Sequence, residues 1–508
     1  MENRQNILIG FLIFLIALFY NAFLLGWDSL NPQSLWLVSG GDPSWHYLGG
    51  AFFLNEPWHW PPGVIETQNI TARTSVGLTD SIPLAAFVLK LFAGIGEGGG
   101  QYFGCWHLLS LFLMGVFGIL WARQWTQSLA LQLLVAAFLI ASPLILMRLT
   151  GHAALTAQWL VVGAMWFYQK PWRLLHWAAL VAIAALIHPY LLAMVLGIAL
   201  CKAIYVKKII PALPLILLAA CLTYLAGYFE GTSIAAEGFG YNRARLFSFF
   251  VPWLHENSLF AGLGVFALAG VLLVSRFFYK NKIQFFSKKT RGLGMCVFVM
   301  VAFSIFTYHA AAIWPIGVLG KMFRANVRFG WPLVYLFTLF VLAGVIQTFP
   351  KKIAIVLLSV ALFWQISPFH PFADIYGQFR TLTQSRKKTP MPTFAELNIF
   401  TQNADTLMIV TRQQSYGESV PFARYAANHR LKTNFVWDAR TDEISAQQFQ
   451  KELWQALQNG QRAPQTFYVF LSDYSADFLK ENLPLELANA LIFFENYAVL
   501  PAKNDFPR

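Results

Sequence analysis

Long apolar runs alternate with short polar segments over the first 370 residues of the chain. An α-helix needs about 20 apolar residues to cross a bilayer core. Runs that reach or approach this length are Ile7–Gly26, Gly104–Trp121, Leu129–Leu146, Ala153–Tyr168, Leu174–Ile187, Tyr190–Tyr205, Ile209–Phe229, Leu259–Val274, Leu293–Ala312, Phe329–Thr348 and Ile353–Ser367. The pattern predicts an α-helical polytopic membrane protein with about 11 transmembrane helices.

A further apolar segment, Ser81–Gly96, decides the predicted topology. It is short, contains Lys90, and places its apolar residues on one side of a helix, as in helices that lie in the membrane interface. If it does not cross, 15 of the 23 basic residues before residue 370 fall on the side of the N-terminus. Cytoplasmic loops are rich in Lys and Arg. We therefore predict a cytoplasmic N-terminus and a C-terminal region on the outer side.

The predicted membrane domain, residues 1–369, has two long outer loops, at 27–103 and 230–258. Residues 370–508 have equal numbers of acidic and basic side chains and alternate between strand and helix patterns. The predicted strands are Thr406–Thr411, Lys432–Trp437, Thr466–Ser472 and Leu491–Leu500, and the predicted helices are Val420–Arg430 and Ala446–Asn459. This order favours a small C-terminal α/β domain with a largely parallel sheet. Because it contains no nucleotide-binding or nucleophile motif, we expect it to provide support or to present substrate.

Composition narrows the class of protein. The chain is 57% hydrophobic and 12% charged, whereas soluble proteins carry about 25% charged residues, so a cytosolic enzyme, a coiled coil and a disordered protein are excluded. The net charge of +13 lies entirely before residue 370, which argues against a nucleic-acid-binding tail. All four cysteines lie in apolar runs, so neither a disulfide framework nor a CxxC metal site is expected.

The strongest local pattern of polar residues is in the first outer loop, around Asp42 and His46. A carboxylate at the outer face can take a proton from an acceptor, or help to hold a divalent cation on a phosphate group. The alternative is structural, because Asp42 before Pro43 suits the N-cap of a helix. Asp80, before the predicted interfacial helix, has the same two interpretations: a second carboxylate in the same cavity, or an N-cap.

Basic residues gather in two outer loops, although positive charge is disfavoured on that side. Arg324 and Arg328 are four residues apart and would share one face of a helical turn. Two guanidinium groups there can bind a lipid phosphate, or else contact ordinary anionic headgroups. The other candidates for the same phosphate pocket are Arg243, Arg245, Tyr241 and Asn242.

Two histidines occupy the outward ends of predicted spans. His152 follows Gly151, and His188 precedes Pro189. Each is either an interfacial residue whose hydrogen bonds are made within the protein or the membrane interface, or a further contact to the substrate. The spacing of the chain's histidines and acidic residues matches no metal-binding motif, so no metal ligand is assigned.

Four segments resemble an uncharacterised bacterial family of membrane proteins similar to the GT-C superfamily: Gly41–Gly63, Thr79–Lys90, Glu237–Trp253 and Phe323–Tyr335. An acidic residue just after the first span, with an interfacial helix before the second, also looks like the GT-C superfamily itself. Its members are membrane glycosyltransferases that use polyprenyl-phosphate-linked sugars. With the outer C-terminal domain, the resemblance covers nearly the whole chain.

The resemblance implies transfer of a hexosyl or pentosyl group from a polyprenyl-phosphate donor to an envelope glycan or lipid. The reaction would occur at the outer face of a bacterial inner membrane, with the C-terminal domain in the periplasm. Asp42 matches the superfamily's first-loop acidic position, which serves as general base or metal-associated residue. Its usual acidic neighbour is absent and His46 stands there, so a divalent cation, Mg or Mn, remains an open alternative. The implied partners are the lipid-linked donor, the bilayer and the acceptor, without nucleic acid.

Two other functions remain open from the sequence. One is a flippase or transporter for a lipid-linked glycan, and the other is a non-catalytic envelope scaffold. Ion-coupled transporters bury ionisable residues near the membrane midplane, and the predicted spans contain almost none there. This argues against ion coupling but not against a passive scramblase.

Overall fold

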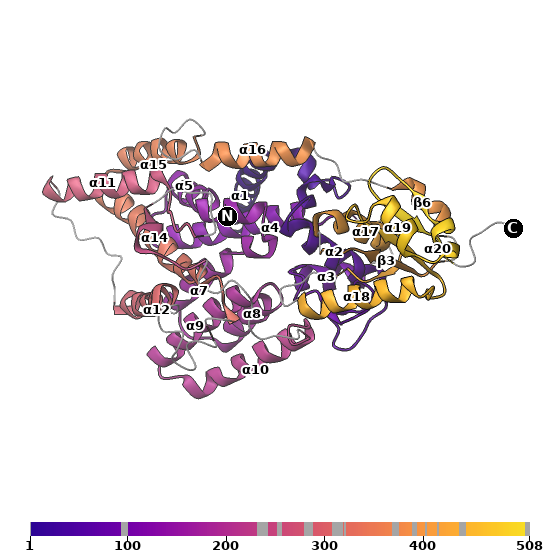
Figure 1. The fold of residues 1–508 in the computed structure, drawn as a ribbon. Helices are drawn as coiled ribbons and strands as arrows, with labels where there is room; N and C mark the ends of the chain where they lie inside the picture. Colours follow the sequence, from indigo (N-terminus) through magenta and orange to yellow (C-terminus); the bar gives the residue numbers. More distant parts are fainter. Residues whose placement is uncertain are drawn as a thin grey trace. The chain divides into compact units, whose positions relative to one another are not determined.

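A computed structural model describes residues 2–92, 100–230, 242–250, 257–278, 288–306, 319, 322–367, 375–388, 394–401, 404–413, 416–435 and 443–502. By internal contacts the chain divides into two units, and the main helices and strands are labelled in Figure 1. Unit 1 is Met1–Leu37, Gln101–Leu222 and Ala235–Lys388, and unit 2 is Val38–Gly100, Thr223–Ile234 and Thr389–Arg508. This partition groups most of the first outer loop with the C-terminal residues. The sequence divided the chain differently, at residue 370, and that domain boundary stays a prediction.

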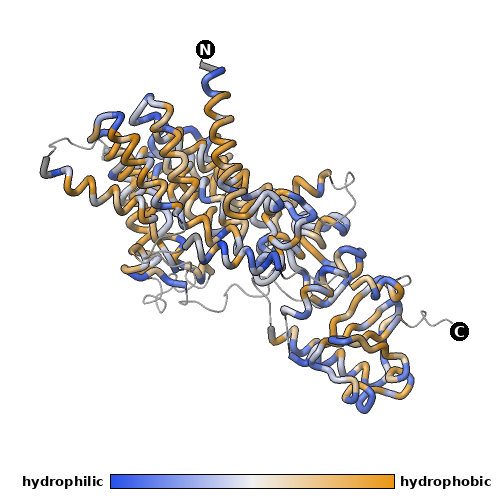
Figure 2. Tube along the Cα trace, turned by 90° about the horizontal axis from the view of Figure 1, so that it is seen from above, coloured by the Kyte–Doolittle hydropathy of each residue, from blue (hydrophilic) through white to orange (hydrophobic). Residues whose placement is uncertain are grey.

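Unit 1 is helical. Its longer helices are α1 (Glu2–Leu25), α4 (Phe103–Ala122), α5 (Leu129–Ile140), α6 (Pro143–Leu149), α7 (Trp159–Gln169), α8 (Leu174–Ala185), α9 (Pro189–Tyr205), α10 (Ile209–Leu225, which runs into unit 2), α11 (Leu263–Phe278), α12 (Lys288–Phe306), α14 (Trp331–Thr348), α15 (Lys351–Ile366) and α16 (Ile375–Lys388). The single-turn helices used below are η3 (Ala153–Thr156), η4 (Leu246–Phe249) and η5 (Asn326–Gly330). Apolar residues continue along most of these helices (Figure 2).

Helix length does not support the predicted count of about eleven membrane spans. Among the described residues, three helical segments are long and apolar enough to cross a membrane: Arg4–Leu25, Phe103–Ala122 and Asn326–Thr348. A fourth is added if α5 and α6, bent by 48° at their junction, form one broken span. Each apolar run of the sequence does contain a helix. Many of these helices are short because irregular turns interrupt the runs, as at Pro143, which cannot donate a backbone hydrogen bond.

Small residues allow the helices of unit 1 to approach closely. A Cβ atom on Gly118 of α4 would lie 2.7 Å from the Cα of Ala136 on α5. A Cβ atom on Gly104, in the first turn of α4, would overlap the carbonyl oxygen of Ser29. Glycine at these two positions therefore sets how closely α4 packs against its neighbours.

Unit 2 contains a five-stranded sheet. Its strands are β3 (Thr406–Val410), β4 (Lys432–Thr433), β5 (Thr466–Phe470), β6 (Ile492–Phe493) and β7 (Ala498–Leu500), in the order β4-β3-β5-β7-β6. The helices among them are α17 (Tyr416–Asn428), α18 (Glu443–Gln458), α19 (Ala476–Asn482) and α20 (Leu485–Ala490). A small C-terminal α/β region is thus confirmed, with β4, β3 and β5 parallel. The single predicted strand Leu491–Leu500 is wrong, because β6 and β7 pair antiparallel across a turn closed by Phe494 and Tyr497.

The first outer loop folds onto this α/β region within unit 2. It provides α2 (Asp42–Asn55), the strand pair β1 (Val64–Ile65) and β2 (Thr74–Ser75), and α3 (Pro83–Leu91). The Thr433 amide donates to the Thr67 carbonyl at 2.9 Å, and the Ile70 amide donates to the Thr433 carbonyl at 3.0 Å. Helix α2 packs against α17. Backbone hydrogen bonds and helix packing therefore join two segments that are far apart in the sequence.

Helix α3 is the observed part of the predicted interfacial segment Ser81–Gly96. With nine residues it rises about 14 Å at 1.5 Å per residue, which is too short to cross a bilayer. Val88, Leu91 and Phe92 are exposed apolar side chains. Residues 93–99 lie outside the described part of the chain.

Candidate functional site

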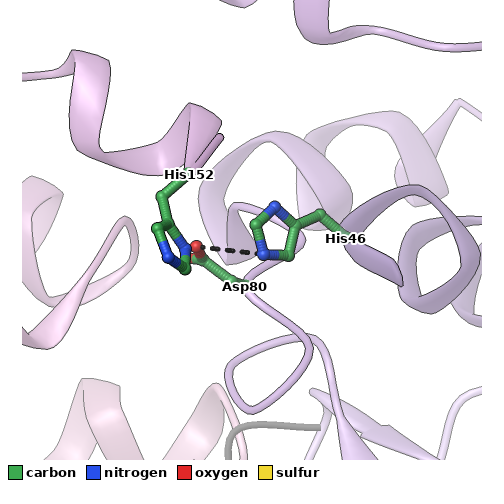
Figure 3. A group of neighbouring side chains, drawn as sticks. All are labelled: His46, Asp80 and His152. Carbon is green, nitrogen blue, oxygen red and sulfur yellow. Dashed lines mark ion pairs between the residues drawn. The ribbon is translucent and has the colours of Figure 1, made fainter. Parts of the chain in front are cut away.

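The structure brings together two of the predicted catalytic residues of unit 2, His46 and Asp80. Nε2 of His46 lies 3.5 Å from Oδ2 of Asp80, and their side chains are only 6% and 12% exposed (Figure 3). His46 lies on α2, and Asp80 lies in the turn before α3. A largely buried imidazole thus faces a carboxylate that is 34 positions away in the sequence.

Local hydrogen bonds hold this turn against α2. The Ser81 hydroxyl donates to the His46 carbonyl at 2.6 Å, and the Thr79 hydroxyl donates to the Ser75 carbonyl at 2.9 Å. A Cβ atom on Gly49 of α2 would overlap the Thr79 side chain, so glycine permits the close approach. Asp80 has φ of +55°, a left-handed conformation that is uncommon for residues other than glycine.

The N-cap interpretation does not hold for either aspartate. Helix α2 begins with Asp42 itself, and its N-cap is Gly41. Helix α3 begins at Pro83 with Ile82 as its N-cap, two residues after Asp80. Asp42 lies four residues before His46, so the two share a helix face. Asp42 is also in the first turn of α2, where the helix dipole favours a negative charge.

Contacts with α17 fix the helix that carries Asp42 and His46. The Asn55 side-chain amide donates to the Ala427 carbonyl at 2.8 Å. The Tyr47 hydroxyl hydrogen-bonds the Arg424 side chain. Burial raises the pKa of Tyr47 above its usual value, and the positive charge of Arg424 opposes this change only in part. The C-terminal region of unit 2 therefore anchors α2 at Tyr47 and at its last residue, Asn55.

The pair of His46 and Asp80 can act as a proton acceptor. A carboxylate beside an imidazole orients the ring and stabilises its protonated form. The same nitrogen and oxygen are close enough to bind one cation. Mg²⁺ prefers oxygen ligands, whereas Mn²⁺ and Zn²⁺ accept imidazole as well. The donor set of this pair thus fits Mn better than Mg.

In unit 1, Arg328 and His188 belong to one connected group of polar side chains. Arg328 is 5% exposed, and its guanidinium carbon lies 4.5 Å from the centre of the Tyr190 ring. The Tyr190 hydroxyl accepts a hydrogen bond from the Ala325 amide at 2.8 Å. Nδ1 of His188 accepts one from the Tyr190 amide at 3.1 Å. The turn that carries Arg328 is therefore held against the start of α9.

Arg324 and Arg328 do not share a helical face. Arg324 lies before η5 and is exposed, whereas Arg328 is within η5 and buried. The helical turn starts only at Asn326, so the spacing of four residues does not place the two side chains on one side.

The second outer loop approaches η5 through Asn242, whose carbonyl accepts a hydrogen bond from the Val327 amide at 3.1 Å. Arg243 is partly buried, and Arg245 is exposed at the N-cap of η4. Tyr241 lies outside the described residues. The structure therefore places Asn242 beside the turn that contains Arg328.

Sequence reasoning missed Arg148, on the short helix α6. Its side chain is 3% exposed, and its guanidinium carbon lies 5.3 Å from the centre of the Trp331 ring. Trp331 begins α14, three residues after Arg328. Two buried guanidinium groups thus lie around the start of α14. The signal available in the sequence was an isolated arginine at the end of an apolar run.

His152 lies just before the single turn η3 of unit 1. The backbone N–H of Leu155, within η3, donates to the His152 carbonyl at 3.0 Å. Its side chain is partly exposed. The backbone position fits the structural interpretation of this residue, and its role as a substrate contact stays a prediction.

The comparison with protein families identifies the chain at the level of its family. A family model described as a domain of unknown function, DUF6311, matches residues 14–369. The chain belongs to the DUF6311 family. The model of the DUF6311 C-terminal domain matches residues 397–496, and a search of curated proteins finds no match. His46, Asp80, Arg148 and Arg328 all fall within the first DUF6311 region, whose description names no activity.

Proposed function

We propose that this DUF6311 protein is a membrane glycosyltransferase of the GT-C type. It moves a sugar from a polyprenyl-phosphate-linked donor to a cell-envelope acceptor at the outer face of a bacterial inner membrane. The distribution of basic residues in the sequence supports a multi-pass arrangement with a cytoplasmic N-terminus and a periplasmic C-terminal region.

The observation that carries the proposal is the burial of Arg148 and Arg328 in an apolar helical unit. Guanidinium groups keep their charge in proteins and bind phosphate oxygens through paired N–H groups. Each of the two lies over an aromatic ring, which stabilises a cation. A lipid phosphate is the anion that such a site in a membrane protein would bind.

The second support comes from His46 and Asp80. In the transfer, an acceptor hydroxyl attacks the anomeric carbon of the donor, and the bond from that carbon to the phosphate oxygen breaks. The acceptor proton passes to the imidazole of His46, whose positive charge Asp80 stabilises. The polyprenyl phosphate leaves as an anion and carries the electron pair of the broken bond.

The test uses the full chain in liposomes that contain polyprenyl-phosphate-linked hexose or pentose, with release of polyprenyl phosphate as the readout. Asp80→Asn should lower the rate by roughly 10²–10⁴-fold, as loss of a general base or its partner does. Asp42→Asn is made alongside, because the sequence points to that carboxylate. Transfer at the wild-type rate in both variants refutes the enzymatic proposal.

Donor binding is tested separately. Arg148→Gln and Arg328→Gln should each weaken donor affinity about tenfold or more, because each removes hydrogen bonds from a charged group. Arg276→Gln is the control, since Arg276 is an exposed arginine at the end of α11. Equal affinity in all three variants refutes the assignment of the phosphate site. Movement of the lipid across the membrane without sugar transfer would identify a flippase.

A further inference from the structure

The carboxyl ends of β3 and β5 in unit 2 carry polar side chains that the proposed function does not use. The chain passes from β3 through α17 to β4 on one side of β3, and then through α18 to β5 on the other side. Because crossover connections are right-handed, α17 and α18 lie on opposite faces of the sheet (Figure 1). The chain reverses its winding direction between β3 and β5. In open α/β sheets, ligands bind outside the carboxyl ends of the strands at such a switch point.

Asp473, just after β5, lies at this switch point. Its Oδ2 accepts hydrogen bonds from the Thr411 hydroxyl at 2.8 Å and from the amides of Arg412 and Gln413 at 2.6 and 3.0 Å. These bonds fix the loop after β5 to the loop after β3. Its Oδ1 is buried and has no hydrogen-bond partner among the described residues. A buried carboxylate oxygen without a donor costs free energy, so a donor group on a ligand would stabilise it.

Two other groups at this edge have fixed orientations. The guanidinium carbon of Arg412 lies 3.6 Å from the centre of the Phe478 ring and 4.8 Å from that of Tyr474. The Ser472 hydroxyl donates to both carboxylate oxygens of Glu418, at 2.9 and 2.8 Å. Arg412 and Glu418 are exposed. Planar polar groups held in this way can form paired hydrogen bonds with neighbouring hydroxyl groups.

The charges at this edge select the class of ligand. Two carboxylates, Asp473 and Glu418, outnumber the single guanidinium of Arg412, so the edge repels phosphate. Glu418 also occupies the first turn of α17, where the helix dipole would otherwise favour an anion. The N–H and O–H groups around Oδ2 of Asp473 present positive ends, which oppose a metal ion at that oxygen. Neutral hydroxyl groups can both donate to the carboxylates and accept from the guanidinium.

We propose that the carboxyl edge of β3 and β5 binds a neutral, polyhydroxylated ligand, a glycan, through Arg412, Glu418 and Asp473. The inference rests on unit 2 alone and does not depend on the proposed sugar transfer. It gives the C-terminal region a binding role in addition to its anchoring of α2.

The test uses the full chain in lipid nanodiscs, because alkyl-maltoside detergents carry a sugar of their own. Maltose, cellobiose and di-N-acetylchitobiose are the probes, and saturation-transfer NMR reports binding, with inorganic phosphate and MnCl₂ as comparisons. We expect at least one disaccharide to bind, and Glu418→Gln to weaken that binding about tenfold. Glu486→Gln is the matched control, since Glu486 is an exposed glutamate in the first turn of α20.

Three results overturn the proposal. One is no binding of any of the disaccharides to the wild-type chain. Another is binding that survives unchanged in both Glu418→Gln and Arg412→Gln. The third is binding of phosphate or Mn²⁺ at this edge without binding of a saccharide. Equal thermal unfolding midpoints of the variants and the wild type show that lost binding is not lost folding.

Discussion

Lys90, on α3 of unit 2, provides the sharpest test of the packing described above. Its ammonium group donates to the Pro57 carbonyl at 3.2 Å and lies 3.8 Å from the centre of the Phe53 ring and 4.8 Å from that of Trp58. The residue is 8% exposed. Burial lowers the pKa of Lys90 from its usual 10.5 to about 8, and the negative charge of Glu56 opposes this change only in part.

The sign of the effect on stability follows from this direction. The folded pKa is below the unfolded pKa, so folding is favoured most above pH 10.5, where the amine is neutral in both states. The free energy of unfolding falls as pH drops from about 10.5 to about 8. Below about pH 8 this loss of stability, the deficit caused by Lys90, stays constant. At about 1.4 kcal/mol per pKa unit, the deficit is about 3 kcal/mol at pH 7.

Lys90→Met keeps an unbranched side chain against Phe53 and Trp58 and removes the charge. A hydrogen bond such as that to the Pro57 carbonyl contributes about 1 kcal/mol. We therefore expect a net gain in the free energy of unfolding of about 2 kcal/mol at pH 7, within the range found when buried charges are replaced by apolar groups. At pH 10 the gain should fall below about 1 kcal/mol, because this pH is close to the unfolded pKa of 10.5 and little of the loss of stability remains there.

The measurement is limited proteolysis of the full chain in graded urea at pH 7 and pH 10, read as the urea midpoint for cleavage within residues 42–91. Lys451→Met is the control, since Lys451 is an exposed lysine on α18, and it should change stability by less than about 0.5 kcal/mol. The reasoning is refuted if Lys90→Met lowers stability at pH 7, or if its gain is the same at both pH values.

Three further substitutions test packing, two of them in unit 1 and one in unit 2. Gly104→Ala places a methyl group against the Ser29 carbonyl and should lower the free energy of unfolding by about 1–3 kcal/mol. Gly270→Ala on α11, whose Cβ would have no neighbour within 4 Å among the described residues, should raise it by up to about 1 kcal/mol. Thermal unfolding of the two variants checks both, and equal shifts contradict the packing. Asn434→Ala removes a side-chain amide that hydrogen-bonds the N–H and C=O of Ile409 at 2.8 and 2.9 Å. We therefore expect the free energy of unfolding to fall by about 2–4 kcal/mol. Urea unfolding measures this, and a change below about 0.5 kcal/mol contradicts it.

The sheet of unit 2 shows what the sequence pattern could and could not predict. Strands β3 and β5 are buried at every position, so each is a continuous apolar run that sequence reasoning detects. The pair β6 and β7 was predicted as one strand, because the turn between Phe494 and Tyr497 contains neither glycine nor proline. Glycine and proline mark turns that need particular backbone angles, and a turn without such angles can lack both residues.

In unit 1 the apolar runs predicted where helices occur but not where they end. Hydropathy continues through Ser142 and Pro143, where the chain bends between α5 and α6. Pro214, by contrast, lies inside α10 without ending it. The same residue type has both outcomes because packing against other helices decides whether a break is tolerated.

The candidate catalytic residues were recognised one at a time and not as a pair. Their spacing in the sequence does not predict the contact between His46 and Asp80. The contact depends on Gly49, which allows α2 to approach the turn that contains Thr79. The helix starts were each wrong by one or more residues, and this shift removed the N-cap interpretation of both aspartates. Element boundaries, which sequence patterns locate least well, therefore determined how the site was interpreted.

The positions of the arginines show why a count of charges is a poor guide to a binding site. The predicted outer cluster of cations was chosen by side of the membrane, yet of its arginines with described side chains Arg328 alone is buried. Arg148 was left out of the cluster and is buried as well. An exposed arginine is solvated and needs no further explanation. A guanidinium keeps its charge when it is buried, and its attraction to an anion is stronger in the low-dielectric interior than at the solvated surface.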